Sequence, residues 1–490
     1  MGLLARVNWL ALLAAAPAAL LAWQVHLTCG IVYSIDDPYI HLALAKQILR
    51  GHYGIHPSEF SAPSSSILWP FLLAPFSFTR IVEFLPLVLN LGAVLATVWW
   101  LQRWLAGYMP PAWSLIVTTT LALTLNIYGL ALSGMENSWQ VAFIVVIAIS
   151  LLQDRIGWPF WLSVLLLPLV RYEGLAMSLP ALAYVWLMPG QRLRAAAVAA
   201  VIVGVVVGFS LFLLSLDLGP LPSSVLAKNR ILDDPSRAIP VFDNIVNQAF
   251  FVALAVASFV LCLQQGRTRM AILLIAVQTL LHLLFGRYGW FARYHIYFVA
   301  WTVILFFDVF ARTRFYRWPA LNALLLAAYV VFSADHVQAT VQTAEASRNI
   351  HDQQRQMGII LRDHFNEPVA VNDLGFVSLY GRGYVLDLAG LASLEALRAQ
   401  RYARSADWVA PLMARRKIEH AIIYPEWLGG LPAGWTHVAT LHLPHPWVSV
   451  ASDRVAFYST NQAAAARFRT ALEAYRKTSA QAAMMLVIER

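Results

Sequence analysis

The chain has 490 residues, of which 59% are hydrophobic and 12% are charged, and its mean hydropathy is +0.62. A soluble domain carries about 25% charged residues, so this composition excludes an ordinary soluble enzyme and indicates a polytopic membrane protein. The net charge of +9 does not indicate a nucleic-acid partner, because the basic residues lie mostly in short loops and form no run interleaved with aromatics.

Long apolar runs follow one another through the first two thirds of the chain. Because a helix needs about 20 apolar residues to cross a bilayer, these runs predict about eleven transmembrane helices, several of them short. The expected spans are residues 7–28, 83–103, 111–129, 137–153, 157–170, 174–188, 195–216, 244–264, 270–285, 292–311 and 318–334. The first run is too long for an ordinary signal peptide and ends without a clean cleavage site, so we expect it to remain as the first helix.

The segment between the first two spans contains the stretch 37–52 and a further apolar stretch, 64–78. Pro70 and Pro75 interrupt the second stretch, and we expect both to be helices along the membrane surface. With the N-terminus in the cytoplasm, arginines then concentrate in short inner loops, for example at 103, 155, 192, 194 and 312–317. This is the positive-inside pattern. It predicts a multi-pass protein of the cytoplasmic (inner) membrane with an extracytoplasmic, periplasmic C-terminal region.

From about residue 335 the composition changes. A polar helical sequence over 339–365 precedes the strand-like runs "PVAVND", "YVLDL", "HAIIY", "HVATLHL" and "RVAFYS". This alternation predicts a transmembrane catalytic domain over 1–334 and an extracytoplasmic α/β domain over 335–490. The Ala-rich tail 461–490 is expected to be helical, and Asp373 and Asp387 are expected to close turns.

The predicted topology brings unusual polar residues from five loops to the outer face. Acids beside a membrane are costly unless they are paired, hydrated or functional. The residues are Asp36, Asp37, Tyr39 and His41 in the first outer loop, Glu136 in "SGMENS", Arg171 and Glu173 in "LVRYEG", Lys228 in "LPSSVLAKN", and Arg287, Arg293, Tyr294 and His295 in "FGRYGWFARYHIY". Together they offer a carboxylate base, cations for a phosphate and aromatic walls for a sugar or lipid chain.

Each motif also has a purely structural interpretation. The alternatives are helix capping for Asp36, Asp37 and Glu136, a fixed ion pair for Arg171 with Glu173, and membrane-interface anchoring for Lys228, Arg287 and Arg293. His41, His52 and His56 could join the aspartate pair around a metal ion, but their spacing matches no dedicated metal site. We therefore assign no metal ligands.

Seven motifs in order, "DDPYI…AKQILRGHYGI", "SSSILW", "SGMENS", "LVRYEG", "LPSSVLAKN", "RYGWFARYH" and "NDLGFVSLYGRGYVLDLAGLAS", resemble the GT-C superfamily of integral membrane glycosyltransferases. The resemblance is strongest to the cell-wall arabinofuranosyltransferase branch. It implies a GT-C-like fold and an acid in the first outer loop that activates the acceptor, here Asp36, the better candidate, or Asp37. The chain departs from the family at "SAPSSSILW", where members often have a "GYTSPLW"-like stretch, and at Lys46 and Arg50, which come later than the family's arginine. The transferred sugar is therefore left open.

The resemblance implies transfer of a sugar from a polyprenyl-phosphate-sugar donor to a hydroxyl of a glycan, lipid or protein acceptor, by one inverting displacement. Lys228, Arg293 and Arg171 are the candidates to hold the donor phosphate. No cofactor is required, although a divalent cation is compatible with this chemistry. Two other functions are considered: a lipid or solute transporter, which tends to carry its ionisable groups near the membrane midplane, and a glycan-binding assembly protein.

Overall fold

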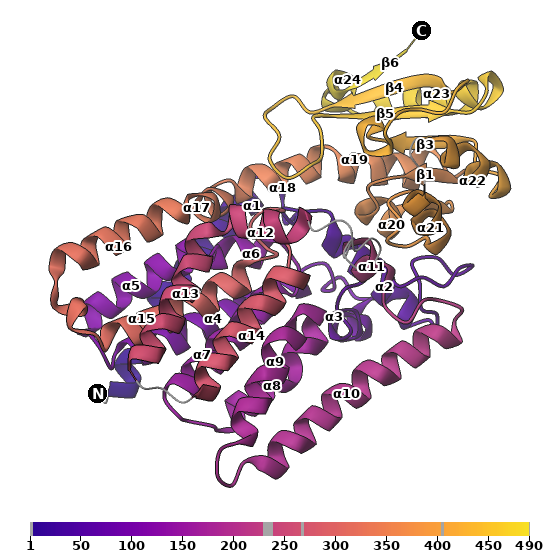
Figure 1. The fold of residues 1–490 in the computed structure, drawn as a ribbon. Coiled ribbons are helices and arrows are strands. Elements are labelled where there is room, and N and C mark those ends of the chain that lie inside the picture. The colour runs from indigo at the N-terminus through magenta and orange to yellow at the C-terminus, as the bar shows by residue number, and fades with distance from the viewer. Residues whose placement is uncertain (1–2, 229–238, 266–268, 403–405, 490) are drawn as a thin grey trace.

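The computed structural model describes residues 3–228, 239–265, 269–402 and 406–489. Figure 1 shows a body of helices joined to a small sheet domain. A helical path along one side of the body leads into the sheet domain through α16 (Pro319–Phe332), α17 (Ala334–Val341), α18 (Thr343–Asp352) and α19 (Gln354–Ile359).

Every predicted span coincides with an α-helix. The helices are α1 (Leu3–Cys29), α4 (Leu85–Leu105), α5 (Pro111–Thr124), α7 (Asn137–Leu152), α8 (Trp158–Val170), α9 (Leu175–Trp186), α10 (Arg192–Ser215), α13 (Ala249–Gln264), α14 (Arg269–Phe285), α15 (Ile296–Ala311) and α16. Two short helices, α6 (Ile127–Leu132) and α12 (Ile239–Asn247), lie between them in the sequence. The prediction that these apolar runs are helical is therefore confirmed.

The expected number of about eleven membrane spans is not confirmed. Among the described residues, three helices (α1, α4 and α10) are long and apolar enough to cross a membrane. The number rises to five if the bent pairs α12–α13 (88°) and α16–α17 (53°) each count as one span. The other helices are short because local breaks end them: α5 stops before Asn126, which has a φ of 50°, and α8 stops after Pro168 at the extended Arg171. A helix of 12–14 residues, such as α9 or α5, spans about 20 Å, less than the roughly 30 Å hydrocarbon core.

The centre of the body is α7. Nearly all of its residues are buried, and it packs against α4, α8 and α15. A helix that is apolar on all sides belongs in the interior of a bundle. Its N-terminal end therefore holds the residues before it, Gly134 to Glu136, in a fixed position.

Three short helices lie between the body and the sheet domain: α2 (Asp37–Ile48), α3 (Leu68–Leu73) and α11 (Ser223–Lys228). The helix predicted over 37–52 is α2, and the stretch 64–78 contains α3 and a short 3₁₀ turn, η1 (Ala74–Phe76). α2 packs against α20 (Gly375–Tyr380), and α11 packs against α21 (Leu394–Tyr402). The segment between α1 and α4 thus forms much of the contact between the two parts of the chain.

The sheet domain has six strands in the order β2-β1-β3-β5-β4-β6. They are β1 (Val369–Val371), β2 (Val385–Asp387), β3 (His420–Ile423), β4 (Thr436–His442), β5 (Arg454–Ser459) and β6 (Leu486–Ile488). β1 is parallel to β2 and β3, and the other pairs are antiparallel. α20 connects β1 to β2, and α21 and α22 (Val409–Arg415) precede β3.

All five strands predicted in this region are confirmed. The expectation of a helical tail needs one correction, because α23 (Gln462–Arg476) and α24 (Ala480–Met485) are followed by β6. β6 pairs with the edge of β4 and buries Leu486. The predicted boundary at residue 334 falls at the bend between α16 and α17, and the division into domains 1–334 and 335–490 stays a prediction.

Candidate functional site

A cavity of about 340 Å³ lies where the segment between α1 and α4, the segment before α15 and the sheet domain meet. The helical body contributes Asp37, His41, Arg287, Arg293 and Tyr294 to its lining, and Ser65 comes from the loop after α2. The sheet domain contributes Asn372, Asp373, Leu374, Ala389, Leu391 and Trp427. Five of the predicted site residues, from two distant parts of the sequence, therefore share one cavity.

Arg293 is the central cation of this cavity. Its side chain is only 2% exposed. Its Nη2 atom donates to an Asp37 carboxylate oxygen and to the Tyr294 hydroxyl, the latter at 2.8 Å. Its Nε and Nη1 atoms have no hydrogen-bond partner among the described residues. A buried guanidinium with unpaired donors is costly unless an anion completes its hydrogen bonds.

The backbone that carries Arg293 is strained. Trp290, Phe291 and Ala292 have φ values of 49°, 59° and 51°, in the left-handed region that is unfavourable for residues with a side chain. Two amides hold the segment: the Asn126 amide donates to the Phe291 carbonyl at 3.1 Å, and the Asn137 amide donates to the Arg293 carbonyl at 3.3 Å. Strain of this kind persists where the surroundings fix it, and it clusters at functional sites.

Asp37 and Asp36 have different surroundings although they are adjacent. Asp37 lines the cavity and pairs with Arg293. Asp36, expected to be the better candidate base, points into the sheet domain instead: its carboxylate oxygens accept the backbone N–H groups of Gly375 at 2.5 Å and Phe376 at 2.9 Å. Gly375 is required there, because a Cβ at this position would collide with the Asp36 carbonyl oxygen. The carboxyl group of Asp36 thus caps α20 across the interface of the two parts of the chain.

Asp36 also forms a carboxyl pair with Asp373. The two side chains are hydrogen-bonded to each other, and Asp373 accepts a hydrogen bond from the Gln354 amide at 2.8 Å. Burial, followed by the charge of Asp373, raises the pKa of Asp36 well above its usual range. Burial likewise raises the pKa of Asp373, while the Gln354 hydrogen bond lowers it. The pair therefore retains a proton, which Asp36 donates to the Asp373 carboxylate.

The predicted ion pair of Arg171 with Glu173 is present, and Glu136 completes it. Arg171 Nη1 lies 3.0 Å from Glu136, and Nη2 lies 2.8 Å from Glu173. With Nε also bonded to Glu173 at 3.2 Å, the guanidinium is occupied by protein carboxylates. Its Cζ atom lies 5.8 Å from the centre of the Tyr294 ring. Arg171 therefore supports the cavity wall from behind and is not itself part of the lining.

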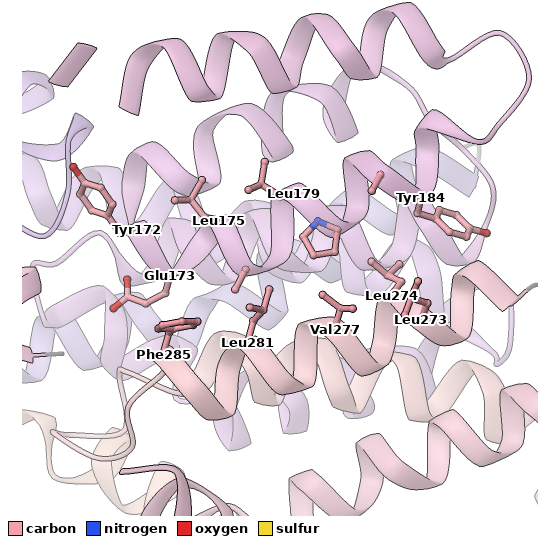
Figure 2. A pocket seen from close by; sticks show the side chains of 13 residues that line it. Tyr172, Glu173, Leu175, Leu179, Tyr184, Leu273, Leu274, Val277, Leu281 and Phe285 are labelled. Atoms are coloured by element: carbon pink, nitrogen blue, oxygen red, sulfur yellow. The ribbon is translucent and has the colours of Figure 1, made fainter. Parts of the chain in front are cut away.

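An apolar groove of about 550 Å³ begins at Glu173. Figure 2 shows its two walls: Leu175 and Leu179 of α9 face Val277, Leu281 and Phe285 of α14, with Glu173 and Tyr172 at one end and Tyr184 at the other. Leu179, Leu273 and Phe285 are 39%, 51% and 45% exposed. Exposed apolar surface of this extent on a helical body indicates contact with lipid. The eleven helical steps from Glu173 to Tyr184 correspond to a length of about 16 Å along the groove.

Two further predicted residues, Tyr39 and His295, lie outside the cavity. Tyr39 is buried and stacks on Phe376 with ring centroids 3.6 Å apart. His295 lines a separate cavity of about 250 Å³ and lies 2.8 Å from His336, measured between their Nε2 atoms. Lys228 ends α11, and its side chain lies outside the described residues, but its neighbour Ala227 lines the main cavity.

The considered histidine metal site is not assembled by the described residues. His41 lies beside Ser64 in the cavity region, whereas His52 contacts the Glu59 carbonyl and His56 accepts the Val385 N–H. One group in the described residues has ligand-type atoms close together, Glu367, Glu419 and His420. Arg467 bonds to both of these glutamates, so the cluster is already neutralised by a protein cation.

The sequence analysis did not predict that residues of the sheet domain line the cavity. Asn372 and Asp373 follow β1, Ala389 follows β2, and Trp427 follows β3. β1 has a parallel neighbour on each side. The carboxyl edge of such strands, where the connections leave in opposite directions, is the usual ligand-binding edge of an α/β domain. A pair of polar residues directly after the buried run "VAV" was the available signal.

Comparison with known proteins gives three findings. A family described as a domain of unknown function, DUF8728, matches residues 348–458, which run from α18 to β5 and include Asp373. No curated protein matches the chain. Among solved structures, the chain is similar to the oligosaccharyltransferase of Archaeoglobus fulgidus, crystallised with Zn and sulfate, at 14% identity and a TM-score of 0.47, over 92% of this chain and 73% of that chain. These values are too low to assign a family, so the function proposed next rests on the site.

Proposed function

We propose that the protein is a membrane glycosyltransferase that moves a sugar from a polyprenyl-phosphate donor to an acceptor hydroxyl in the cavity around Arg293. The acceptor is a glycan, a lipid or a protein. The proposed location is the cytoplasmic membrane, with the cavity and the sheet domain on the extracytoplasmic side.

The observation that carries this proposal is the buried guanidinium of Arg293, two of whose nitrogen atoms have no hydrogen-bond partner in the described part of the chain. Guanidinium N–H groups donate charge-assisted hydrogen bonds to phosphate oxygens, and Nε and Nη1 can each donate one. The exposed side chain of Arg287 lines the same cavity. A donor phosphate bound here would meet two cations, and its charge would remain compensated as the sugar–phosphate bond breaks.

The groove between α9 and α14 supports a lipid donor rather than a nucleotide sugar. It is almost entirely apolar, and its polar end is Glu173. Glu173 is bonded to Arg171, and Arg171 lies against the ring of Tyr294, which lines the cavity. The tail of a polyprenyl phosphate in this groove would therefore end beside the proposed phosphate site.

The proposed reaction is a single displacement at the anomeric carbon. The acceptor hydroxyl attacks, the bond from carbon to phosphate oxygen breaks, and the leaving phosphate takes the bonding electrons. One of the two cavity carboxylates, Asp37 or Asp373, takes the hydroxyl proton. Fixed donors aimed at developing charge typically contribute a factor of about 10²–10³ to kcat, and this is the role of Arg293. No step requires a cofactor, and a divalent cation bound by the two carboxylates is compatible with the reaction.

The test is a transfer assay with the full-length protein in nanodiscs. Polyprenyl phosphates carrying radiolabelled arabinofuranose, mannose or glucose are incubated with membrane extract as the acceptor source, and released lipid phosphate and labelled product are measured. We expect transfer from one of these donors and a loss of about 100-fold or more in Arg293→Gln. Arg454→Gln, which changes an arginine that is 67% exposed on β5, is the matched control and should transfer normally. No transfer from any donor, or normal transfer by Arg293→Gln, would contradict the proposal.

A further inference from the structure

The cavity contains a second carboxylate, and it belongs to the sheet domain. Asp373 lies two residues after β1, on the edge where the carboxyl ends of β1, β2 and β3 open toward the helical body. Its side chain is half-buried and lines the same cavity as Arg293. The sheet domain therefore does more than cover the cavity, because it contributes an ionisable group to it.

Neighbouring side chains fix the orientation of Asp373. Gln354 donates to the Asp373 carboxylate at 2.8 Å and to the Tyr424 hydroxyl at 2.9 Å, and that hydroxyl donates to the Gln353 side chain at 2.5 Å. On another side Asp36, held by Gly375 and Phe376, bonds to the carboxyl group of Asp373. A side chain fixed in this way is preorganised, as a group that must meet a reacting atom has to be.

The two cavity carboxylates differ in their charge partners. Asp37 pairs with Arg293, and a carboxylate that is bonded to a guanidinium is a weak base. The partners of Asp373 given above are neutral or acidic groups, and no lysine or arginine forms an ion pair with it among the described residues. Burial raises the pKa of Asp373, toward the range in which a general base works best.

We propose that Asp373 is the general base of the transfer reaction, with Asp36 as its positioning residue and Asp37 as the residue that orients Arg293. This inference rests on the proposed function. In the step, the acceptor oxygen forms a bond to the anomeric carbon, its proton moves to the Asp373 carboxylate, and the bond from the anomeric carbon to the phosphate oxygen breaks with both electrons going to the phosphate. Asp373 then releases the proton to water.

The experiment compares Asp373→Asn and Asp373→Ala with Asp363→Asn, a control that changes an exposed carboxylate of the same domain. Transfer is measured with the donor that the wild-type protein uses, and binding is measured with undecaprenyl monophosphate. We expect transfer by Asp373→Asn to fall by about 10²–10⁴, while the lipid phosphate binds as tightly as to wild type or more tightly, because a negative charge beside the phosphate is removed. Formate, acting as an external base, should restore part of the transfer by Asp373→Ala.

Transfer by Asp373→Asn within about threefold of wild type would overturn the inference and leave the proposed function intact. Loss of transfer that is accompanied by weaker lipid-phosphate binding, with no restoration by formate, would also overturn it, because that result indicates a structural role. If the wild-type protein transfers no sugar from any donor, the proposed function itself fails, and this outcome is distinguished by the wild-type measurement alone.

Discussion

Replacement of Asp36 by alanine tests how the sheet domain is held on the helical body. The carboxyl group of Asp36 accepts hydrogen bonds from the N–H groups of Gly375 and Phe376 at a buried position. Asp36→Ala leaves both donors without a partner, and each unsatisfied buried donor costs about 1–3 kcal/mol. The docked arrangement should therefore lose about 2–6 kcal/mol. Asp36→Asn keeps one acceptor oxygen and should lose less.

Two measurements check this expectation. Thermal unfolding should show a Tm for the sheet domain that is lower by about 4 °C or more, at roughly 2–4 °C for each kcal/mol in a domain of this size. Limited proteolysis should release a fragment that begins near the bend at Ser333. Asp363→Ala removes an exposed carboxylate paired with Arg362, which is worth at most about 1 kcal/mol, and should change neither result. Wild-type Tm and wild-type protease resistance in Asp36→Ala would refute the interface described here.

Three further predictions concern other parts of the molecule. Burial raises the pKa of Asp387 to about 6, so the stability that the protonated side chain contributes is fully present below about pH 4 and is lost as the pH rises through about 6. Asp387→Asn should therefore reduce the loss of unfolding free energy between pH 4 and pH 7 by about 2 kcal/mol in urea unfolding, and an unchanged pH dependence would contradict this assignment. Arg171→Met leaves the buried Glu136 without its cation and should destabilise the helical body by about 3–5 kcal/mol. Adding Glu136→Gln to the same chain should restore part of this stability. Equal stability of wild type and Arg171→Met would show that the ion pair contributes nothing. Val277→Trp fills the α9–α14 groove and should weaken binding of undecaprenyl monophosphate about tenfold, without affecting binding of geranyl monophosphate. The control variant Leu280→Trp, on the outer side of the same helix, should bind both lipids as wild type does. Equal binding of undecaprenyl monophosphate by the two variants would exclude the groove as the tail site.

Local sequence patterns were sufficient for most of the elements. The apolar runs predicted the helices because burial of apolar side chains drives their formation, and the short Val- and Ile-rich runs predicted β1 to β5. The number of membrane spans could not be predicted from the apolar runs, because the length of a helix depends on single breaks such as Asn126 and Pro168. β6 was missed because its pairing with β4 is a tertiary contact.

Part of the candidate site was also predictable from the sequence. Asp37 and Arg293 stood out because charged residues are rare in this chain and need partners beside a membrane. The role of Asp36 could not be read locally, because 339 residues separate it from the Gly375 N–H that it binds. The residues that the sheet domain contributes to the cavity depend on the strand order. The sequence alone does not show which strands have their carboxyl ends facing the helical body.

Cryo-electron microscopy of the protein in nanodiscs with undecaprenyl monophosphate tests whether the cavity around Arg293 binds a lipid-linked phosphate. We expect density for the phosphate between Arg293 and Arg287, with the isoprenoid chain lying between α9 and α14. A phosphate elsewhere would contradict this expectation. An isoprenoid chain in another large apolar cavity, of about 560 Å³ and lined by residues such as Trp104, Phe250 and Tyr329, would contradict it as well.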